Sequence, residues 1–122
     1  MDDRTRLETL DRTILEEWRG NKPEAQLRGW LTAWSGAGRG SDFPLYEGRN
    51  FVGSAAIASV RIADEGFPDL ACNIRINAGQ WMLIDIDSDC GTMVNDEQVF
   101  RHELEDEDWI KYDKLLFRIK KK

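Results

Sequence analysis

The stretch Trp81–Asn95, which reads WMLIDIDSDCGTMVN, carries the strongest structural signal in the chain. Its first half alternates along an extended backbone, with Trp81 and Leu83 on one face and Met82 and Ile84 on the other. Such alternation is typical of a β-strand with one buried face. The second half is rich in Asp, Ser and Gly, which indicates a loop. This stretch therefore predicts a strand that runs into a surface loop.

Short segments of the same kind lie on both sides of this stretch. Asn77–Gly79 reads as a hairpin turn that joins it to a strand over Cys72–Ile76. The glycine-rich segment Gly36–Gly40 reads as another hairpin turn. The remaining candidate strands are Trp30–Trp34, Phe43–Tyr46, Asn50–Val52, Val60–Ile62, Gln98–Phe100, Trp109–Tyr112 and Leu115–Ile119. About nine short strands divided by turn residues predict an all-β fold, a two-sheet sandwich over residues 29–120.

Residues 1–22 have a different period. Leu7, Leu10, Ile14 and Trp18 are three or four residues apart and would form one apolar stripe on an amphipathic α-helix. Gly20 is a C-cap residue that would end this helix. The stripe would pack on the chain's own sandwich or against another copy in a homo-oligomer. The alternative is that it docks on a different partner.

The composition limits the classes of partner. The chain has 122 residues, 41% of them apolar, and a net charge of −6, which fits one globular domain with an acidic surface. An acidic surface disfavours nucleic acid and anionic membranes as partners. No apolar run approaches the roughly 18 residues of a membrane helix, and the N-terminus lacks the apolar core of a secretory signal. We therefore expect no membrane insertion.

The two cysteines, Cys72 and Cys90, do not have the number or spacing of a disulfide framework. They indicate a reducing, cytoplasmic compartment in which both stay thiols, although a single bridge between them is the alternative.

Three stretches in this order resemble the forkhead-associated (FHA) domain family. Leu45–Ser54 is similar to its opening strands, which end in Gly-Arg. Trp81–Asn95 matches the family pattern W-x-L-x-D-x-x-S-x-N-G-T-x-V-N at every fixed position except one. Leu104–Tyr112 is similar to L-x-D-G-D-x-I-x-I. The resemblance implies an FHA-like (SMAD/FHA-type) sandwich that acts as a non-enzymatic protein-interaction module.

The resemblance also implies where a phosphothreonine would bind, and the chain departs from the family at each position. The usual Arg after Gly53 is Ser54. The usual Ser-Arg-x-His run aligns with residues 68–71, so Pro68 has no N–H to give and Asp69 puts a carboxylate where a cation is usual. The usual Asn before Gly-Thr is Cys90, preceded by Asp89. The sequence therefore predicts that phosphothreonine recognition has been lost.

The remaining family positions have scaffold roles. Gly53 and Gly91 permit tight backbone turns, and Asp85 is the family's structural aspartate. The short side chains of Ser88 and Thr92 can bond nearby backbone, and Asn95 suits a turn. Arg49, Arg61 or Arg75 could supply a relocated cation for a rearranged phosphopeptide site.

Other chemistry has little support in the residues. His102 is the single histidine and reads as a surface or strand-edge residue. Asp85, Asp87 and Asp89 alternate and could bind a hard cation weakly, but they read as one structural and two solvated residues. No catalytic set, zinc set or cofactor motif is present, so we expect neither enzyme nor cofactor.

Three functions follow in order of preference. The first is a scaffold or protein–protein interaction module without phosphate readout, as occurs among FHA-like domains of bacterial secretion or signalling assemblies. The second is a phosphopeptide reader with a rearranged site. The third is a small enzyme on a β-sandwich.

Overall fold

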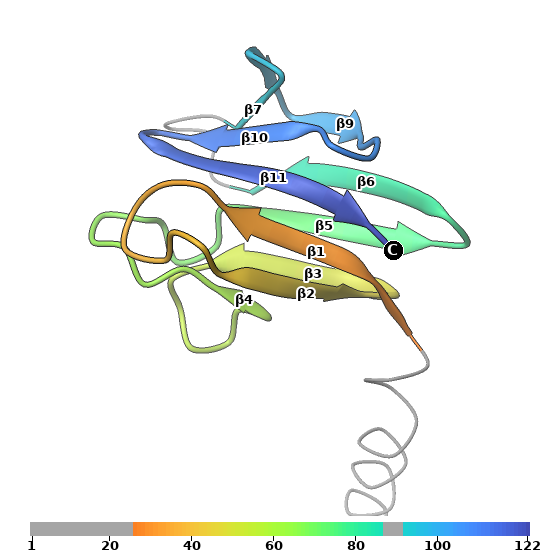
Figure 1. Cartoon of the computed structure of the whole chain (residues 1–122), viewed down its shortest axis with the longest axis horizontal. Helices are drawn as coiled ribbons and strands as arrows, with labels where there is room; N and C mark the ends of the chain where they lie inside the picture. The colour runs from red at the N-terminus through yellow and green to blue at the C-terminus, as the bar shows by residue number, and fades with distance from the viewer. Residues whose placement is uncertain (1–25, 87–91) are drawn as a thin grey trace, which may run out of the picture.

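In the computed structural model, residues 26–86 and 92–122 are described. They contain β-strands and turns arranged as two sheets (Figure 1). The all-β sandwich expected from the alternation is therefore confirmed. The helix expected within residues 1–22, with the homo-oligomer contact assigned to it, lies outside the described residues. The described part holds no helix with the length and apolarity needed to cross a membrane.

The first sheet has six strands in the order β2-β1-β11-β10-β7-β8. Every pairing given for it is antiparallel, and β1 joins β2 to β11. Its strands are β1 (Leu27–Ala33), β2 (Asp42–Tyr46), β7 (Thr92–Val94), β8 (Glu97–Val99), β10 (Trp109–Tyr112) and β11 (Leu115–Lys121).

The second sheet has five strands in the order β4-β3-β5-β6-β9. The β3–β4 pair is parallel, whereas the other pairs are antiparallel. Its strands are β3 (Gly48–Gly53), β4 (Val60–Arg61), β5 (Cys72–Asn77), β6 (Gln80–Asp85) and β9 (Arg101–Glu103).

The core lies between the two sheets and follows the alternation of the strands. On β6, Trp81 and Leu83 are buried, whereas Met82 and Ile84 are half-buried on the outer face. The other buried apolar side chains include Leu31, Leu45, Val52, Ile62, Ile74, Ile76, Val94, Leu104, Ile110, Phe117 and Ile119.

One inward position on β3 is polar. Asn50 is 1% exposed, and its side chain closes three hydrogen bonds. Its Oδ1 accepts from the Tyr46 N–H at 2.9 Å, and its Nδ2 donates to the carbonyls of Tyr46 at 2.8 Å and Ile74 at 2.9 Å. A buried amide is stable only when its groups are paired in this way, so Asn50 fixes the bend between β2 and β3 without an unsatisfied polar atom.

The turn expected at Asn77–Gly79 is confirmed. Asn77 pairs with Gln80, and the two residues between them, Ala78 and Gly79, have φ angles of 51° and 84°. Positive φ at both central positions is the two-residue turn that matches the twist of antiparallel strands. Figure 1 shows this hairpin at one end of the sandwich and the loops after β3 and β4 at the opposite end.

Candidate functional site

The loops that follow β3 and precede β5 meet at Gly53. A Cβ on this residue would overlap the carbonyl oxygen of Asp69 and crowd the Cα of Leu70. Only glycine allows the two backbones to approach so closely. Next to Leu70, the Ala71 N–H donates to the Val52 carbonyl at 2.7 Å. This hydrogen bond continues the β3–β5 pairing up to Gly53.

Ser54, at the position where the family carries Arg, faces the loop before β5. Its N–H donates to the Pro68 carbonyl at 3.0 Å. Its Oγ donates to the carbonyls of Phe67 at 2.9 Å and Pro68 at 3.2 Å. Ala55 adds a hydrogen bond from its N–H to the Asp69 carbonyl at 3.2 Å. The side chain of Ser54 thus holds the two loops together.

Pro68 and Asp69 line the other side of this junction. Pro68 is half-buried and offers its carbonyl, which Ser54 uses, but it has no N–H. Asp69 is exposed, and the described residues give its carboxylate no hydrogen bond or ion pair. The outward charge of this loop is therefore negative, where a phosphate would require a cation.

Arg61 is the arginine that reaches this junction among the described residues. Its Nε donates to the Ser54 carbonyl at 3.2 Å. Arg49 is five residues before Ser54 on an extended strand, which separates them by roughly 16 Å, and Arg75 lies opposite Arg49. Of the three arginines considered for a relocated cation, the structure thus brings Arg61 to the loops and places Arg49 and Arg75 away from them.

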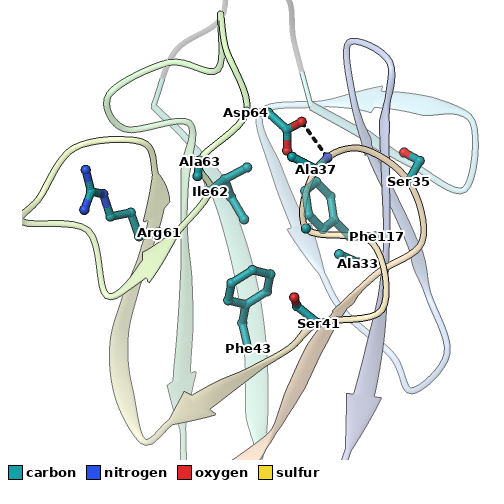
Figure 2. Close-up of a pocket in the computed structure, with 11 residues that line it drawn as sticks. Ala33, Ser35, Ala37, Ser41, Phe43, Arg61, Ile62, Ala63, Asp64 and Phe117 are labelled. Carbon is teal, nitrogen blue, oxygen red and sulfur yellow. Dashed lines mark hydrogen bonds between the residues drawn. The ribbon is translucent and has the colours of Figure 1, made fainter.

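A cavity of about 240 Å³ lies beside Arg61 (Figure 2). Phe43, Ile62 and Phe117 form its apolar wall. Asp64 closes one side, where its Oδ1 accepts a hydrogen bond from the Ala37 N–H at 2.8 Å. The cavity is mostly apolar, with Ser35 and Ser41 as its small hydroxyl groups.

The segment 87–91 between β6 and β7, which contains Ser88, Asp89, Cys90 and Gly91, lies outside the described residues. Its two flanks are joined, because the Thr92 Oγ1 donates to the Asp85 Oδ1 at 2.7 Å. The Ile86 N–H donates to the Ala71 carbonyl at 2.9 Å, which ties the same flank to the loop before β5.

Asn95 and Asp108 organise the neighbouring turns. Asn95 has a φ of 49°, its Nδ2 donates to Asp108 Oδ1 at 3.0 Å, and its Oδ1 accepts from the Trp109 N–H at 3.0 Å. Asp108 is 9% exposed, and its Oδ2 accepts from the Glu105 N–H at 2.8 Å. The acidic run from Glu103 to Asp108 therefore contains a buried structural carboxylate.

Burial limits the chemistry open to Cys72, the cysteine among the described residues. Cys72 is a buried free thiol, and burial raises its pKa to about 12, with a smaller contribution from the Asp85 carboxylate. A thiol that stays protonated is a poor nucleophile. His102 is half-buried on the edge strand β9, as expected. No three His, Cys, Asp or Glu side chains within the described ranges cluster as a metal site would require.

The strand register also reveals a feature that the sequence did not indicate. Arg101 was assigned no role, and β9, the short strand on which it lies, was not expected. The structure places Arg101 on the outer face of the five-stranded sheet, the face that also carries Arg49 and Arg75. Only the pairing of β9 with β6 brings it there.

Comparisons with known proteins were made for the whole chain. Residues 33–122 match the model of a family described as inner membrane component of T3SS, cytoplasmic domain, where T3SS is the type III secretion system. A search of curated proteins found no match.

Several solved structures are similar over most of the chain. One comes from a structural and functional analysis of phosphothreonine-dependent FHA domain interactions; it is 29% identical, with a TM-score of 0.69, and the match covers 76% of this chain and 95% of that one. The FhaA FHA domain complexed with the intracellular domain of Rv3910 is 30% identical, with a TM-score of 0.67 and coverages of 75% and 98%. The FHA domain of the CT664 protein from Chlamydia trachomatis is 24% identical, with a TM-score of 0.68 and coverages of 76% and 96%, and shows the fold alone.

Proposed function

The chain belongs to the family of T3SS inner membrane component cytoplasmic domains, an FHA-type family, and we propose that it is a cytoplasmic protein-interaction module that works without phosphothreonine recognition. The resemblance to FHA domains drawn from the three sequence stretches is thereby confirmed. FHA domains are protein-interaction modules, and the remaining question is what this one recognises.

The conformation of Ser54 supports the loss of phosphothreonine recognition. Its Oγ donates to two carbonyls of the facing loop, so the hydroxyl is used inside the protein. The side chain that faces outward beside it is the Asp69 carboxylate. A phosphate carries about −1.5 to −2 charges and needs converging donors, so this pair of residues would repel it rather than bind it.

A protein partner fits both the family and its relatives. The family is described as part of a secretion system, and the FhaA domain is in a complex with the intracellular domain of another protein. We infer that this chain likewise contacts a protein of an assembly. The buried, protonated thiol of Cys72 offers no nucleophile, so we propose a binding role and no catalytic one.

One observation favours a second function. The Arg61 Nε lies 3.2 Å from the Ser54 carbonyl, so a guanidinium is present at the loop junction, although it comes from β4. If Arg61 turned outward, it could pair with a phosphate and give a rearranged phosphopeptide site. The neighbouring Asp69 opposes this function.

Titration of the intact chain with phosphothreonine peptides, followed by backbone amide shifts, separates the two functions. We expect no saturable shift at Ser54, Arg61 or Asp69 and no difference between each peptide and its unphosphorylated form. Saturable, phosphate-dependent shifts that disappear in Arg61→Gln would establish the rearranged site and refute the proposed function.

A further inference from the structure

Three arginines lie on the outer face of the five-stranded sheet. Arg49 on β3 is directly opposite Arg75 on β5, and Arg75 is opposite Met82 on β6. In the next row, Ile84 on β6 is opposite Arg101 on β9. All three arginines are exposed, and neighbouring strands are about 4.8 Å apart, so they lie within one surface about 15 Å wide.

The described residues do not neutralise these arginines. None of the three has an ion pair or hydrogen bond with a described side chain, and Arg49 and Arg75 form a like-charge cross-strand pair, which destabilises a sheet. Two other described arginines, by contrast, are paired with carboxylates: Arg28 with Glu47 at 2.9 Å and Arg118 with Glu107 at 3.7 Å. Glu103 on β9, opposite Met82, is an exposed carboxylate on the same face, and no ion pair joins it to the arginines, so three arginines against one glutamate leave the face positive. A positive face on a chain of net charge −6 is the arrangement expected of a binding surface that is kept at a cost in stability.

A groove between Arg75 and Arg101 gives this face its shape. It has a volume of about 140 Å³, and Met82 and Ile84 contribute its apolar lining. The side-chain amides of Asn77 and Gln80 lie at its hairpin end, where both residues are exposed. The groove therefore combines two guanidinium groups, an apolar lining and two amides that can bond a backbone.

We propose that this face docks an acidic, partly apolar segment of a partner protein, with its carboxylates on Arg75 and Arg101 and an apolar side chain on Met82 and Ile84. The planar guanidinium binds a carboxylate through two parallel hydrogen bonds, so Arg recognises such groups better than Lys does. This inference rests on the proposed function: if the chain is a protein-interaction module, the inference names the surface that binds and the chemistry of the partner.

The same observations favour a protein segment over other anionic surfaces. A lipid headgroup layer is flat and would leave the apolar groove and its two amides unused, and the net charge of −6 opposes approach to it. A second copy of the chain would approach with the same net charge of −6, which opposes association of the two copies, and in its acidic turn Glu107 is already paired with Arg118 and Lys120. Asp106 is likewise used, since it accepts from the Lys121 N–H at 2.7 Å.

The test titrates the intact chain with a blocked peptide of alternating glutamate and leucine and follows amide and arginine side-chain shifts. We expect saturable shifts at Arg75, Gln80, Met82, Ile84 and Arg101, and none with the matched glutamine–leucine peptide. Arg75→Gln and Arg101→Gln should each weaken binding about fivefold, as expected for exposed charge pairs. Arg101→Lys should recover only part of the loss, because the charge remains and the paired hydrogen bonds do not.

Lys111→Gln is the matched control, since it removes one positive charge from the exposed outer face of the other sheet and should leave binding unchanged.

The proposal is overturned if millimolar peptide gives no saturable shifts on the outer face of the five-stranded sheet. It is also overturned if the shifts follow protein concentration alone, which would mean self-association, or if phosphatidylserine vesicles compete fully for the same arginines. A phosphate-dependent response at Ser54 and Asp69 would refute the proposed function but would leave the response of the sheet face unchanged. Failure of the proposed function can therefore be distinguished from failure of the docking proposal.

Discussion

Thr92 on β7 donates a hydrogen bond from its Oγ1 to Asp85 Oδ1 on β6 at 2.7 Å and so joins the two sheets of the sandwich. Thr92 is fully buried, and Asp85 is half-buried. The bond closes the base of the loop that includes Ser88 and Cys90. It therefore links the packing of the core to the end of the domain where the recognition loops lie.

Thr92→Val tests this link, because valine keeps the shape of the side chain and removes the hydroxyl. We expect the free energy of unfolding, measured by urea denaturation, to fall by about 1.5–3 kcal/mol, as for a hydrogen bond to a charged group. Asp85→Asn in the Thr92→Val background should cost less than Asp85→Asn alone. Strictly additive losses would show that the two side chains do not interact.

Gly53→Ala should be severely destabilising, because the new methyl group would overlap the Asp69 carbonyl and the backbones cannot separate without breaking the Ser54 and Ala71 hydrogen bonds. We expect a loss of about 3 kcal/mol or more in thermal or urea unfolding, the range of strongly disruptive substitutions. Gly38→Ala is the matched control, since its nearest neighbours would be 3.8 Å away or farther, and it should change stability by less than about 0.5 kcal/mol. Equal effects at the two positions would contradict the close approach.

The buried thiol predicts a pH dependence of stability. Burial raises the pKa of Cys72 to about 12 in the fold, from 9.0 for an unperturbed cysteine thiol. Above pH 9 the unfolded chain therefore loses this proton first, and stability must fall as the pH rises toward 12. Between pH 8 and pH 10.5 the wild type should lose roughly 2 kcal/mol more than Cys72→Ala. Parallel urea curves for the two proteins across this range would exclude the raised pKa.

Ala78 offers a stabilising substitution. Its φ of 51° lies in the left-handed region, which costs an alanine about 1 kcal/mol, whereas asparagine tolerates it and is favoured in this turn. Ala78→Asn should raise the free energy of unfolding by about 0.5–1 kcal/mol. The hydrogen bond from the Ala78 N–H to Glu47 Oε2 at 3.0 Å uses only the backbone of residue 78, so asparagine can form it as well. A decrease in stability would mean that the turn changes its conformation.

The sequence alone allowed much of the sandwich to be predicted. The nine strand segments expected from alternation all correspond to strands of the structure, and the inward positions of Trp81 and Leu83 are confirmed. The hairpin at Ala78-Gly79 was also recognisable, because turn residues between alternating segments are a local signal. The fold class thus follows from short-range patterns that each segment carries in itself.

Two strands, β7 and β9, were missed for different reasons. Thr92–Val94 follows the Asp-, Ser- and Gly-rich stretch that reads as a loop, and Arg101–Glu103 contains no apolar residue that could show alternation. The polar residue Asn50 at an inward position was also unexpected, since its partners Tyr46 and Ile74 come from outside its own strand. The inward orientation of the Ser54 side chain likewise depends on residues distant in sequence, because its hydroxyl bonds to the carbonyls of Phe67 and Pro68, thirteen and fourteen residues later.

The sequence by itself determined the resemblance to FHA domains, which implies that Ser54 and Asp69 stand where that family carries cations. Only the tertiary structure decided that Arg61 reaches these loops while Arg49, Arg75 and Arg101 share the outer face of a sheet. The physical reason is register: alternation assigns each side chain to one of two faces of its own strand. Hydrogen bonding between strands distant in sequence then decides which side chains become neighbours.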